Sequence, residues 1–306
     1  MKNILQLSFT VVSLVFAVSI FGQQDPMFTQ SFDNMSYVNP AYAGSRGMLN
    51  ITDLSRIQWV GFDGNPRSTA LSINSPIFKE SIGAGLNLIH DQVGPVKQTL
   101  LFADLAYAVK VNNKGGKLSF GLKAGFNLIN INAAELVTTD PNDPYLAQNI
   151  QNEFNPNFGA GIYYHSPKWY IGVSSPKVIK QSYDPISTTN LEMRHYFGVI
   201  GGIIKFSEEW KFKPAAQVRV TEGAPLSLDL SAAGVYRDKF WIGGLYRLNA
   251  AYGVFAQFQI SPQFKIGVAS EFDTGLLRSY NTGSFEVLLS YDMNFKKEGV
   301  RSPRYF

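Results

Sequence analysis

The chain has 306 residues, no cysteine and three histidines, and its formal net charge is +4. The lack of cysteine excludes a disulfide framework, a thiolate metal site and a lipoprotein anchor. The charge is too small and too scattered to indicate a nucleic-acid partner. Charged residues are 16% of the chain, against roughly 25% in ordinary soluble domains, while aromatic residues reach 14%. This composition favours a protein in contact with lipid.

The first residues have the layout of a secretory signal peptide. Lys2 precedes an apolar run, and the chain turns polar at Gln23. The run is short for a bilayer span and no basic cluster follows it, which argues against a transmembrane anchor. We expect residues 1–22 to be removed by cleavage between Gly22 and Gln23; cleavage after Ser19 is the alternative.

Beyond this segment, no apolar run is long enough for a membrane helix, but several stretches alternate apolar and polar residues with a period of two. In the clearest stretch, residues 117–128, every second residue is apolar and those between are Ser, Gly, Lys or Asn. Such segments, separated by turns, are typical of a transmembrane β-barrel, where all backbone polar groups are hydrogen-bonded within the sheet. Candidate strands cover residues 47–60, 68–76, 81–90, 98–111, 117–131, 157–165, 168–174, 194–206, 209–220, 225–236, 239–247, 251–260, 263–272 and 284–295.

The connections between these candidate strands alternate in length. Residues 112–116, 166–168 and 237–239 form short turns, whereas residues 132–156 and 175–193 form much longer connections. Bacterial outer-membrane barrels have short periplasmic turns and longer extracellular loops. An even number of strands also returns the C-terminus to the periplasm, beside the start of the first strand.

We therefore predict an all-β fold, a transmembrane antiparallel β-barrel of about 14 strands over residues 47–295. A soluble sandwich or lipocalin-like barrel is the alternative, because alternating strands also build those folds. In a soluble fold the second face of each strand would meet water. Here that face is rich in Gly, Ala, Ser and Asn and has few charges, as expected for a crowded barrel interior.

The stretch QQDPMFTQSFDNMSYVNPAYAG, residues 23–44, has no regular period and is too apolar for a solvated linker. Its large apolar side chains belong to Met27, Phe28, Phe32, Met35, Tyr37 and Tyr42. We expect residues 23–46 to be a periplasmic segment that folds into the lumen. Packing beneath the barrel floor is the alternative.

Charged residues on the less apolar strand faces are predicted to point into the lumen. Because they carry both signs, opposite charges should pair across a narrow interior and leave little open aqueous path. These candidate lumen charges are Asp104, Lys110, Lys123, Lys211, Lys213, Arg219, Asp229, Glu286 and Asp292.

The C-terminal tail, residues 296–306, follows the last candidate strand and should lie in the periplasm. It combines cations with an aromatic ending, which offers charge-assisted hydrogen bonds and an anchor for a partner. The predicted docking residues are Arg301, Arg304, Tyr305 and Phe306. Contact with the inner leaflet of the outer membrane, or a role of the last aromatic residue in barrel assembly, are the alternatives.

The sequence argues against an enzyme. His90, His165 and His195 share no ligand spacing, and the chain has neither a G-x-S-x-G element nor a Walker-type loop. We expect no catalytic residues, no metal and no cofactor.

Three segments carry a resemblance to a known family: DPMFTQ, which starts at Asp25, NPAYAG from Asn39 to Gly44, and RIQWVGFDGNPRS from Arg56 to Ser68. They resemble the PorP/SprF family of outer-membrane proteins, which is associated with type IX secretion and gliding motility in the Bacteroidota. The ending, SFEVLLSYDMNF followed by RSPRYF, is similar to members on the SprF side of this family.

The resemblance implies an integral, non-enzymatic barrel in a Gram-negative outer membrane. For the SprF-like branch it implies a protein that helps to export or anchor a large secreted surface protein, such as an adhesin. The implied partners are outer-membrane lipid, that surface protein, and periplasmic components of the secretion and gliding machinery. A transport channel for a small solute, with the N-terminal segment as a hatch, is the alternative.

Overall fold

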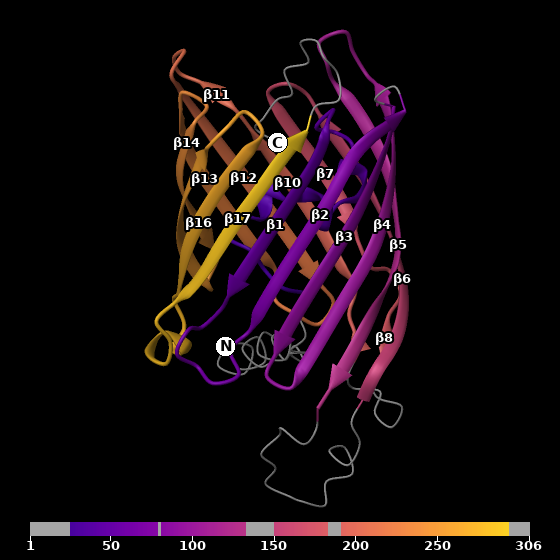
Figure 1. The fold of residues 1–306 in the computed structure, drawn as a ribbon, viewed down its shortest axis with the longest axis vertical. Coiled ribbons are helices and arrows are strands. Elements are labelled where there is room, and N and C mark those ends of the chain that lie inside the picture. The colour runs from indigo at the N-terminus through magenta and orange to yellow at the C-terminus, as the bar shows by residue number, and fades with distance from the viewer. Residues whose placement is uncertain (1–24, 79–80, 133–149, 183–190, 294–306) are drawn as a thin grey trace, which may run out of the picture.

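A computed structural model describes residues 25–78, 81–132, 150–182 and 191–293 of the chain. Fourteen antiparallel strands form a closed barrel (Figure 1). They are β1 (Leu49–Ile57), β2 (Arg67–Phe78), β3 (Ile82–Val93), β4 (Val96–Lys110), β5 (Lys117–Ile131), β6 (Ile150–His165), β7 (Trp169–Ser175), β10 (His195–Gly202), β12 (Trp210–Thr221), β13 (Ser227–Tyr236), β14 (Phe240–Arg247), β15 (Ala251–Gln259), β16 (Phe264–Asp273) and β17 (Ser284–Met293). The predicted fold class is confirmed.

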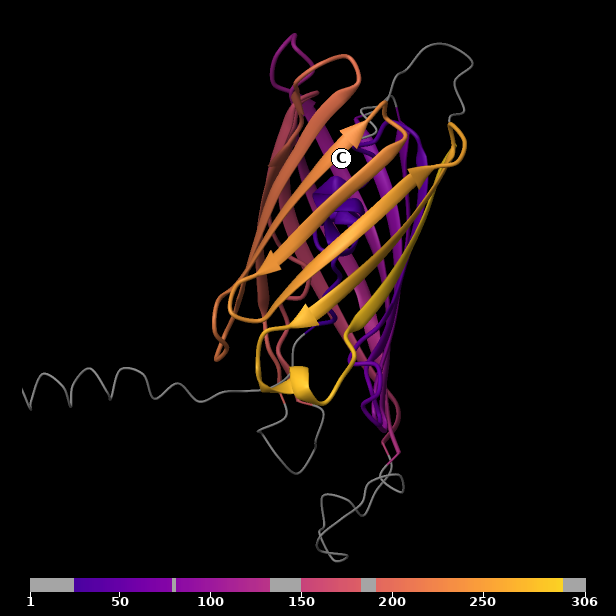
Figure 2. The same cartoon turned by 90° about the vertical axis from the view of Figure 1, so that its left-hand side faces the viewer.

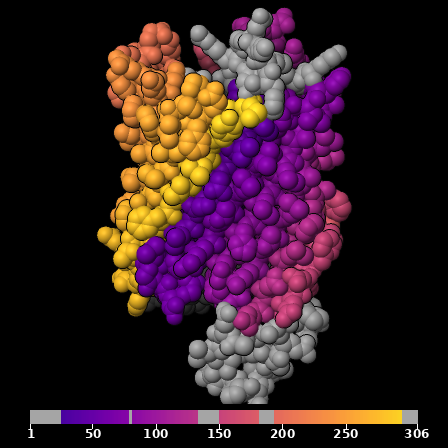
Figure 3. Space-filling model, viewed as in Figure 1, coloured from indigo at the N-terminus to yellow at the C-terminus, as the bar shows by residue number. Residues whose placement is uncertain are grey.

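Each barrel strand pairs with its neighbour in the chain, and the ring closes where the first strand meets the last. The register of β1 and β17 runs from Leu49 opposite Met293 to Ile57 opposite Phe285. Figure 3 shows the face of the molecule on which these two strands lie side by side. Three shorter strands accompany the barrel: β11 (Ile204–Lys205) pairs with β12, and β8 (Gln181–Ser182) pairs with β9 (Leu191–Glu192).

The period-two pattern sorts side chains between lipid and lumen. In β5, Phe120 and Leu122 are 48% and 66% exposed, whereas Ser119 and Lys123 on the opposite face are 2% exposed. Large exposed apolar side chains recur in this way around the barrel. An apolar outer belt with a polar interior is the arrangement of a transmembrane barrel, because lipid solvates the outer face and water does not. Among the described residues, no helix is both long enough and apolar enough to span a bilayer.

Aromatic side chains border this belt at both ends. At the end that holds the short turns, ring centroids of Tyr164 and Trp169 are 4.6 Å apart and those of Phe240 and Phe258 are 4.8 Å apart. At the other end, Tyr252 lies 5.7 Å from Phe272. Amphipathic and aromatic rings at these positions are typical of the two headgroup levels of a membrane.

One predicted strand is too short. The sequence places a strand at residues 157–165, but β6 begins at Ile150 and pairs with β5 along its whole length. The added residues include Asn152 and Asn155, which interrupt the apolar pattern. Backbone pairing to β5, with an irregularity between Ile129 and Ile131, keeps them in the sheet despite their low strand preference.

The connections lie at two ends, as the sequence predicts. Those after β2, β4, β6, β10, β13 and β15 leave the barrel at the end where β17 stops, which we call the short-turn end. The connections after β1, β3, β5, β7, β12, β14 and β16 lie at the opposite, long-loop end, which also holds η6 (Leu276–Ser279) (Figure 1). Antiparallel pairing of every strand with its neighbour enforces this separation.

The lipid-facing assignment can be tested with arginine. Leu122→Arg, near the middle of β5, should cost on the order of 2–4 kcal/mol of folding free energy, because it places a cation near the bilayer midplane. The control Ile77→Arg, near the short-turn end of β2, should cost about 0–1 kcal/mol. Urea titration of refolding into lipid vesicles measures both, and equal costs would contradict the assignment.

Candidate functional site

Residues 25–46 lie inside the barrel, and we call them the plug. Figure 2 shows their short coils within the ring of strands. The coils are three 3-10 helices, η1 (Ser31–Asp33), η2 (Met35–Tyr37) and η3 (Pro40–Tyr42). Pro40 starts the last helix, and the Asn39 side chain accepts a hydrogen bond of 3.0 Å from the backbone N–H of Ala41. Short 3-10 helices, the last of them capped by Asn39, suit a segment that must turn repeatedly in a narrow space.

The apolar residues of the plug form the centre of the protein core. Phe28, Met35 and Tyr42 are each at most 2% exposed and pack in one cluster with inward side chains of the wall, among them Leu54 and Phe102. Burial of aromatic surface against the wall offsets the entropy cost of ordering the segment. The plug therefore occupies the lumen itself and does not pack beneath the barrel.

Glycines of the wall allow the plug to approach closely. A Cβ atom at Gly121 would lie 2.1 Å from the backbone nitrogen of Ala41, and one at Gly83 would lie 2.0 Å from the carbonyl oxygen of Ala43. At Gly161 it would lie 2.2 Å from Oδ1 of Asn39. These contacts leave no room for a larger side chain, so glycine is needed wherever β3, β5 and β6 touch η3 and the turn after it.

The plug starts at the long-loop end. An oxygen of Asp25 lies 2.5 Å from Nζ of Lys177, just beyond β7, and another lies 3.5 Å from Nδ1 of His195, the first residue of β10. Arg219, near the end of β12, donates a hydrogen bond of 3.4 Å to the Asp25 carbonyl oxygen. Burial opposes ionisation of Asp25, but the charges of His195 and Lys177 outweigh it and hold the pKa of this carboxyl group well below its usual value.

The plug ends at the short-turn end. Nη2 of Arg46 lies 3.0 Å from Oδ2 of Asp292, which is close to the last residue of β17. Residues 25–46 therefore cross the whole lumen before β1 begins. From the sequence we expect a periplasmic segment that folds into the lumen. The even number of strands does not indicate that the first residues of this segment reach the long-loop end.

Carboxylates of the wall hold the backbone of the plug near the long-loop end. The N–H groups of Thr29 and Gln30 donate to the two oxygens of Glu286 at 2.8 and 2.9 Å. The Thr29 hydroxyl donates to Glu271 at 3.0 Å and accepts from Nη1 of Arg56 at 3.1 Å. Hydrogen bonds to charged groups are stronger than neutral ones, so this is a firm attachment.

These carboxylates belong to a buried ion network. Arg56 lies 2.6 Å from Glu271, and Arg247 lies 3.1 Å from the same carboxylate and 2.9 Å from Asp229. All these side chains are at most 5% exposed. Pairing offsets the desolvation cost that each buried charge would carry alone.

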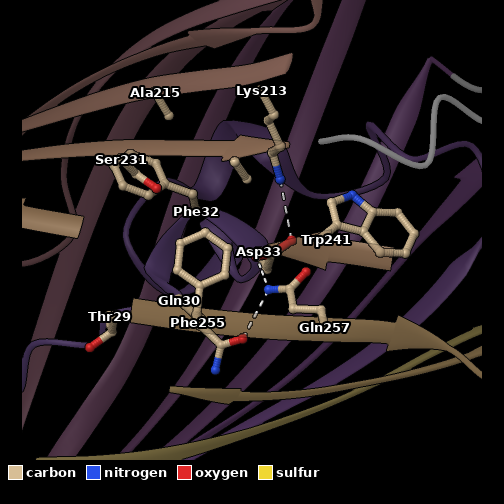
Figure 4. Close-up of a pocket in the computed structure, with 11 residues that line it drawn as sticks. Thr29, Gln30, Phe32, Asp33, Lys213, Ala215, Ser231, Trp241, Phe255 and Gln257 are labelled. Atoms are coloured by element: carbon tan, nitrogen blue, oxygen red, sulfur yellow. Dashed lines mark hydrogen bonds and ion pairs between the residues drawn. The ribbon is translucent and has the colours of Figure 1, made fainter. Parts of the chain in front are cut away.

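A second attachment holds Asp33. Its Oδ1 atom lies 2.9 Å from Nζ of Lys265 and 3.3 Å from Nζ of Lys213, and Nε2 of Gln257 donates to its Oδ2 atom at 2.8 Å. Figure 4 shows Asp33 between Lys213 and Gln257. Burial opposes ionisation, yet the two ammonium groups keep the pKa of Asp33 far below its usual value.

The small cavity in Figure 4 measures how completely the plug fills this part of the lumen. It lies between Phe32, Asp33 and the wall side chains of Trp241 and Phe255, and its volume is about 10 Å³. That is roughly the space for one water molecule. A solute cannot pass through a gap of this size.

A third polar attachment lies against β4 and β5. Nζ of Lys123 lies 2.8 Å from Asp104, and the Asn87 amide donates to that carboxylate at 2.7 Å. Ser36 of the plug donates to Asp104 and accepts from Lys123 at 3.4 Å through its carbonyl oxygen. Lys123 and Asp104 are the predicted lumen charges that lie directly opposite each other in the register of β4 and β5.

The other candidate lumen charges are distributed as follows. Lys213, Arg219, Asp229 and Glu286 are buried, and Asp292 is partly buried against Arg46. Lys211 is partly buried at the short-turn end and pairs with Asp238 at 2.6 Å, while Lys110 is exposed at the end of β4. The predicted cleavage site at Gly22 and Gln23, and the tail residues Arg301, Arg304, Tyr305 and Phe306, lie outside the described residues.

The sequence interpretation missed several residues of these networks: Asp25, Asp33, Arg56, Lys177, Arg247, Lys265 and Glu271. Lys265 and Glu271 sit at alternate positions of a predicted strand whose other face is apolar, so the period-two pattern could have found them. The acids of the plug had no such signal because the plug has no period. No group of three or more His, Cys, Asp or Glu side chains suited to a metal ion occurs among the described residues.

Removal of the Asp33 charge tests the attachment of the plug. Asp33→Asn leaves Lys213 and Lys265 buried without their carboxylate, which should lower the free energy of unfolding by on the order of 3–5 kcal/mol. The matched control is Glu208→Gln, which removes one partner of an exposed pair with Lys205 and should cost about 0–1 kcal/mol. Urea titration of the folded barrel measures both. If Asp33→Asn lowers the free energy of unfolding by no more than Glu208→Gln does, Asp33 does not hold the plug.

Comparison with known proteins places this barrel in a family. No curated protein is detectably similar to the chain. Among solved structures, Omp33 of Acinetobacter baumannii is 7% identical with a TM-score of 0.46, over 80% of this chain and 98% of that one. The KdgM porin is 12% identical with a TM-score of 0.38, over 80% and 99%. The sequence model of a protein family, the type IX secretion system membrane protein PorP/SprF, matches residues 20–291. The chain therefore belongs to the PorP/SprF family and is an integral protein of the Gram-negative outer membrane.

Proposed function

We propose that this protein is a non-enzymatic, SprF-like barrel that docks a large secreted surface protein, such as an adhesin, during or after type IX export. The single observation that carries the proposal is the filled lumen. The plug crosses the barrel from Asp25 to Arg46 and is attached at both ends by buried ion pairs. Because the described residues 25–46 fill the lumen, this proposal assigns function to the long-loop end, the short-turn end and the lipid-facing wall.

The ends of the barrel suit different partners in this proposal. In outer-membrane barrels the short turns face the periplasm and the longer loops face the exterior. The exterior end would hold the surface protein, and the periplasmic end would meet the secretion or gliding machinery. We also propose that residues 1–22 are a signal peptide, that barrel residues end near residue 295, and that residues 296–306 are the periplasmic docking tail.

Removal of the tail tests the docking role. Deletion of residues 301–306 should leave a folded, heat-modifiable barrel in the outer membrane but abolish surface display of the partner, since the charged and aromatic docking groups are lost. Display is measured on whole cells with protease shaving and mass spectrometry. The partner should also copurify with the tagged full-length barrel in mild detergent.

The control is a tail in which Lys296 and Lys297 alone are changed to Gln, which removes charge but keeps the Arg-Tyr-Phe ending. Normal display after deletion of residues 301–306 would show that the tail is not the docking element. Loss of the barrel itself would identify the tail as an assembly signal. A full-length barrel that captures no secreted protein would overturn the docking function as a whole.

A planar bilayer measurement separates docking from solute transport. The intact protein should show little or no steady conductance, because the plug and its ion pairs leave no continuous aqueous path. Deletion of residues 25–44 should raise the conductance if the barrel stays closed. A large steady conductance of the intact protein would favour the solute channel.

A further inference from the structure

The outer wall carries a hollow with a polar side on β1, β2 and β3. Its outward side chains on β1, β2 and β3 are Ser55, Arg67, Thr69, His90 and Gln92, which we call the rim patch. The register places Thr69 between Ser55 and His90, and Arg67 opposite Gln92, so the five residues form one continuous surface. The hollow has a volume of about 400 Å³.

The hollow is apolar on its other side. Its outward side chains there are Ile57, Phe285 and Val287, and Ile57 lies opposite both Phe285 and Arg67 in the register of β17, β1 and β2. Arg56, Ser68 and Glu286 also line the hollow, but their side chains are buried on the lumen side of the wall. All these strands lie on the face of the molecule shown in Figure 3. The result is an amphipathic site, with an apolar side on β17 and a polar side on β2 and β3.

The rim patch lies at the long-loop border of the lipid-facing belt. On β15, β16 and β17 the outward residues nearest this border are aromatic, namely Tyr252, Phe272 and Phe285, each at least 36% exposed. On β2 and β3 the equivalent outward positions hold Arg67 and Gln92. The aromatic girdle is therefore replaced by a cation and an amide over these strands. Because girdle residues sit at the headgroup level, the rim patch faces headgroups of the outer leaflet.

The chemistry of the rim patch suits a phosphorylated sugar. The exposed guanidinium of Arg67 forms no ion pair within the part of the chain that the structure describes, and guanidinium groups bind phosphate in a bidentate manner. Nδ1 of His90 lies 3.0 Å from the hydroxyl of Thr99, which leaves Nε2 for a ligand. Hydroxyl and amide groups of Thr69 and Gln92 can bond sugar oxygens.

Two acids beside the patch point toward the lumen: Glu286, which borders the hollow, accepts hydrogen bonds from Thr29 and Gln30, and Asp91 accepts one from Ser68. A third acid lies deeper in the wall. Asp53 also faces outward on β1 and accepts a hydrogen bond of 3.1 Å from Ser55, whose oxygen is 3.3 Å from the hydroxyl of Thr69. This carboxylate is two residues farther from the long-loop end than Ser55. It would stand beneath a bound headgroup and not beside the Arg67 guanidinium.

We propose that the rim patch binds a phosphorylated glycolipid of the outer leaflet. Arg67 and His90 hold its phosphate, Thr69 and Gln92 contact its sugar, and Ile57, Phe285 and Val287 contact the start of its acyl chains. An anionic lipid at this position is attracted by a cation at the membrane border and shielded from water by the apolar side of the hollow.

Native mass spectrometry of the full-length barrel in detergent tests this site. The probe is monophosphoryl lipid A, compared with its dephosphorylated form, with phosphatidylglycerol and with inorganic phosphate. We expect one tightly bound monophosphoryl lipid A, with binding about tenfold weaker for Arg67→Gln and weaker still for Arg67→Gln combined with His90→Gln. Arg67→Lys should retain part of the affinity because it keeps the charge.

The matched control is Arg278→Gln, which removes an exposed cation at the same end, in η6, that does not line the hollow. It should bind the probe as the parent protein does, and heat-modifiability confirms that every variant is folded. Equal binding by the parent and Arg67→Gln would overturn the proposal. The proposal would also be overturned if the parent protein bound phosphatidylglycerol, dephosphorylated lipid A or inorganic phosphate as tightly as it binds monophosphoryl lipid A. A dimer of the barrel that Arg67→Gln disrupts would assign the patch to a second copy of the chain instead.

Discussion

The structure depends on one electrostatic constraint, which is that every charge inside a narrow, closed barrel needs a partner. Glu286, Lys213 and Lys265 point inward from the wall, and the plug supplies their counterparts through backbone N–H groups and the carboxylate of Asp33. A water-filled lumen could solvate these groups, but the plug excludes water. The charges of the wall and the polar groups of the plug therefore pair with each other, and without the plug the wall charges would depend on water for solvation.

This constraint bears on function. A solute channel needs inward charges that stay hydrated and accessible. Here Arg56, Arg247 and Glu271 pair with one another, and each of these side chains is at most 4% exposed. The plug also differs from a loosely held hatch, because it is attached near both mouths and in the middle. Under the proposed docking function, such a barrel would serve as a membrane platform whose specificity for partners resides on its ends and its outer wall.

The sequence was sufficient for the parts of the structure that repeat. Period-two alternation identifies the strands, and the polar face of β5 predicts that Lys123 points inward, because side-chain direction in a strand is a local property. The path of the plug was not predictable in this way. Its partners, such as Lys177 for Asp25 and Asp292 for Arg46, are far away in sequence and become neighbours only when the ring closes. Lys110 was predicted to be a lumen charge. It does lie in a strand, but it is the last residue of β4 and is exposed there.

Closure of the ring and attachment of the plug are carried by the same strand. β17 completes the barrel by pairing with β1, and it also carries Glu286, which accepts from Thr29 and Gln30, and Asp292, which pairs with Arg46. A plug that crosses the whole lumen is most easily placed while the wall is still open. Since β17 is the last barrel strand in the chain, its docking would close the wall and lock both halves of the plug in one step. The pairing of buried charges thus couples the filling of the lumen to the completion of the barrel.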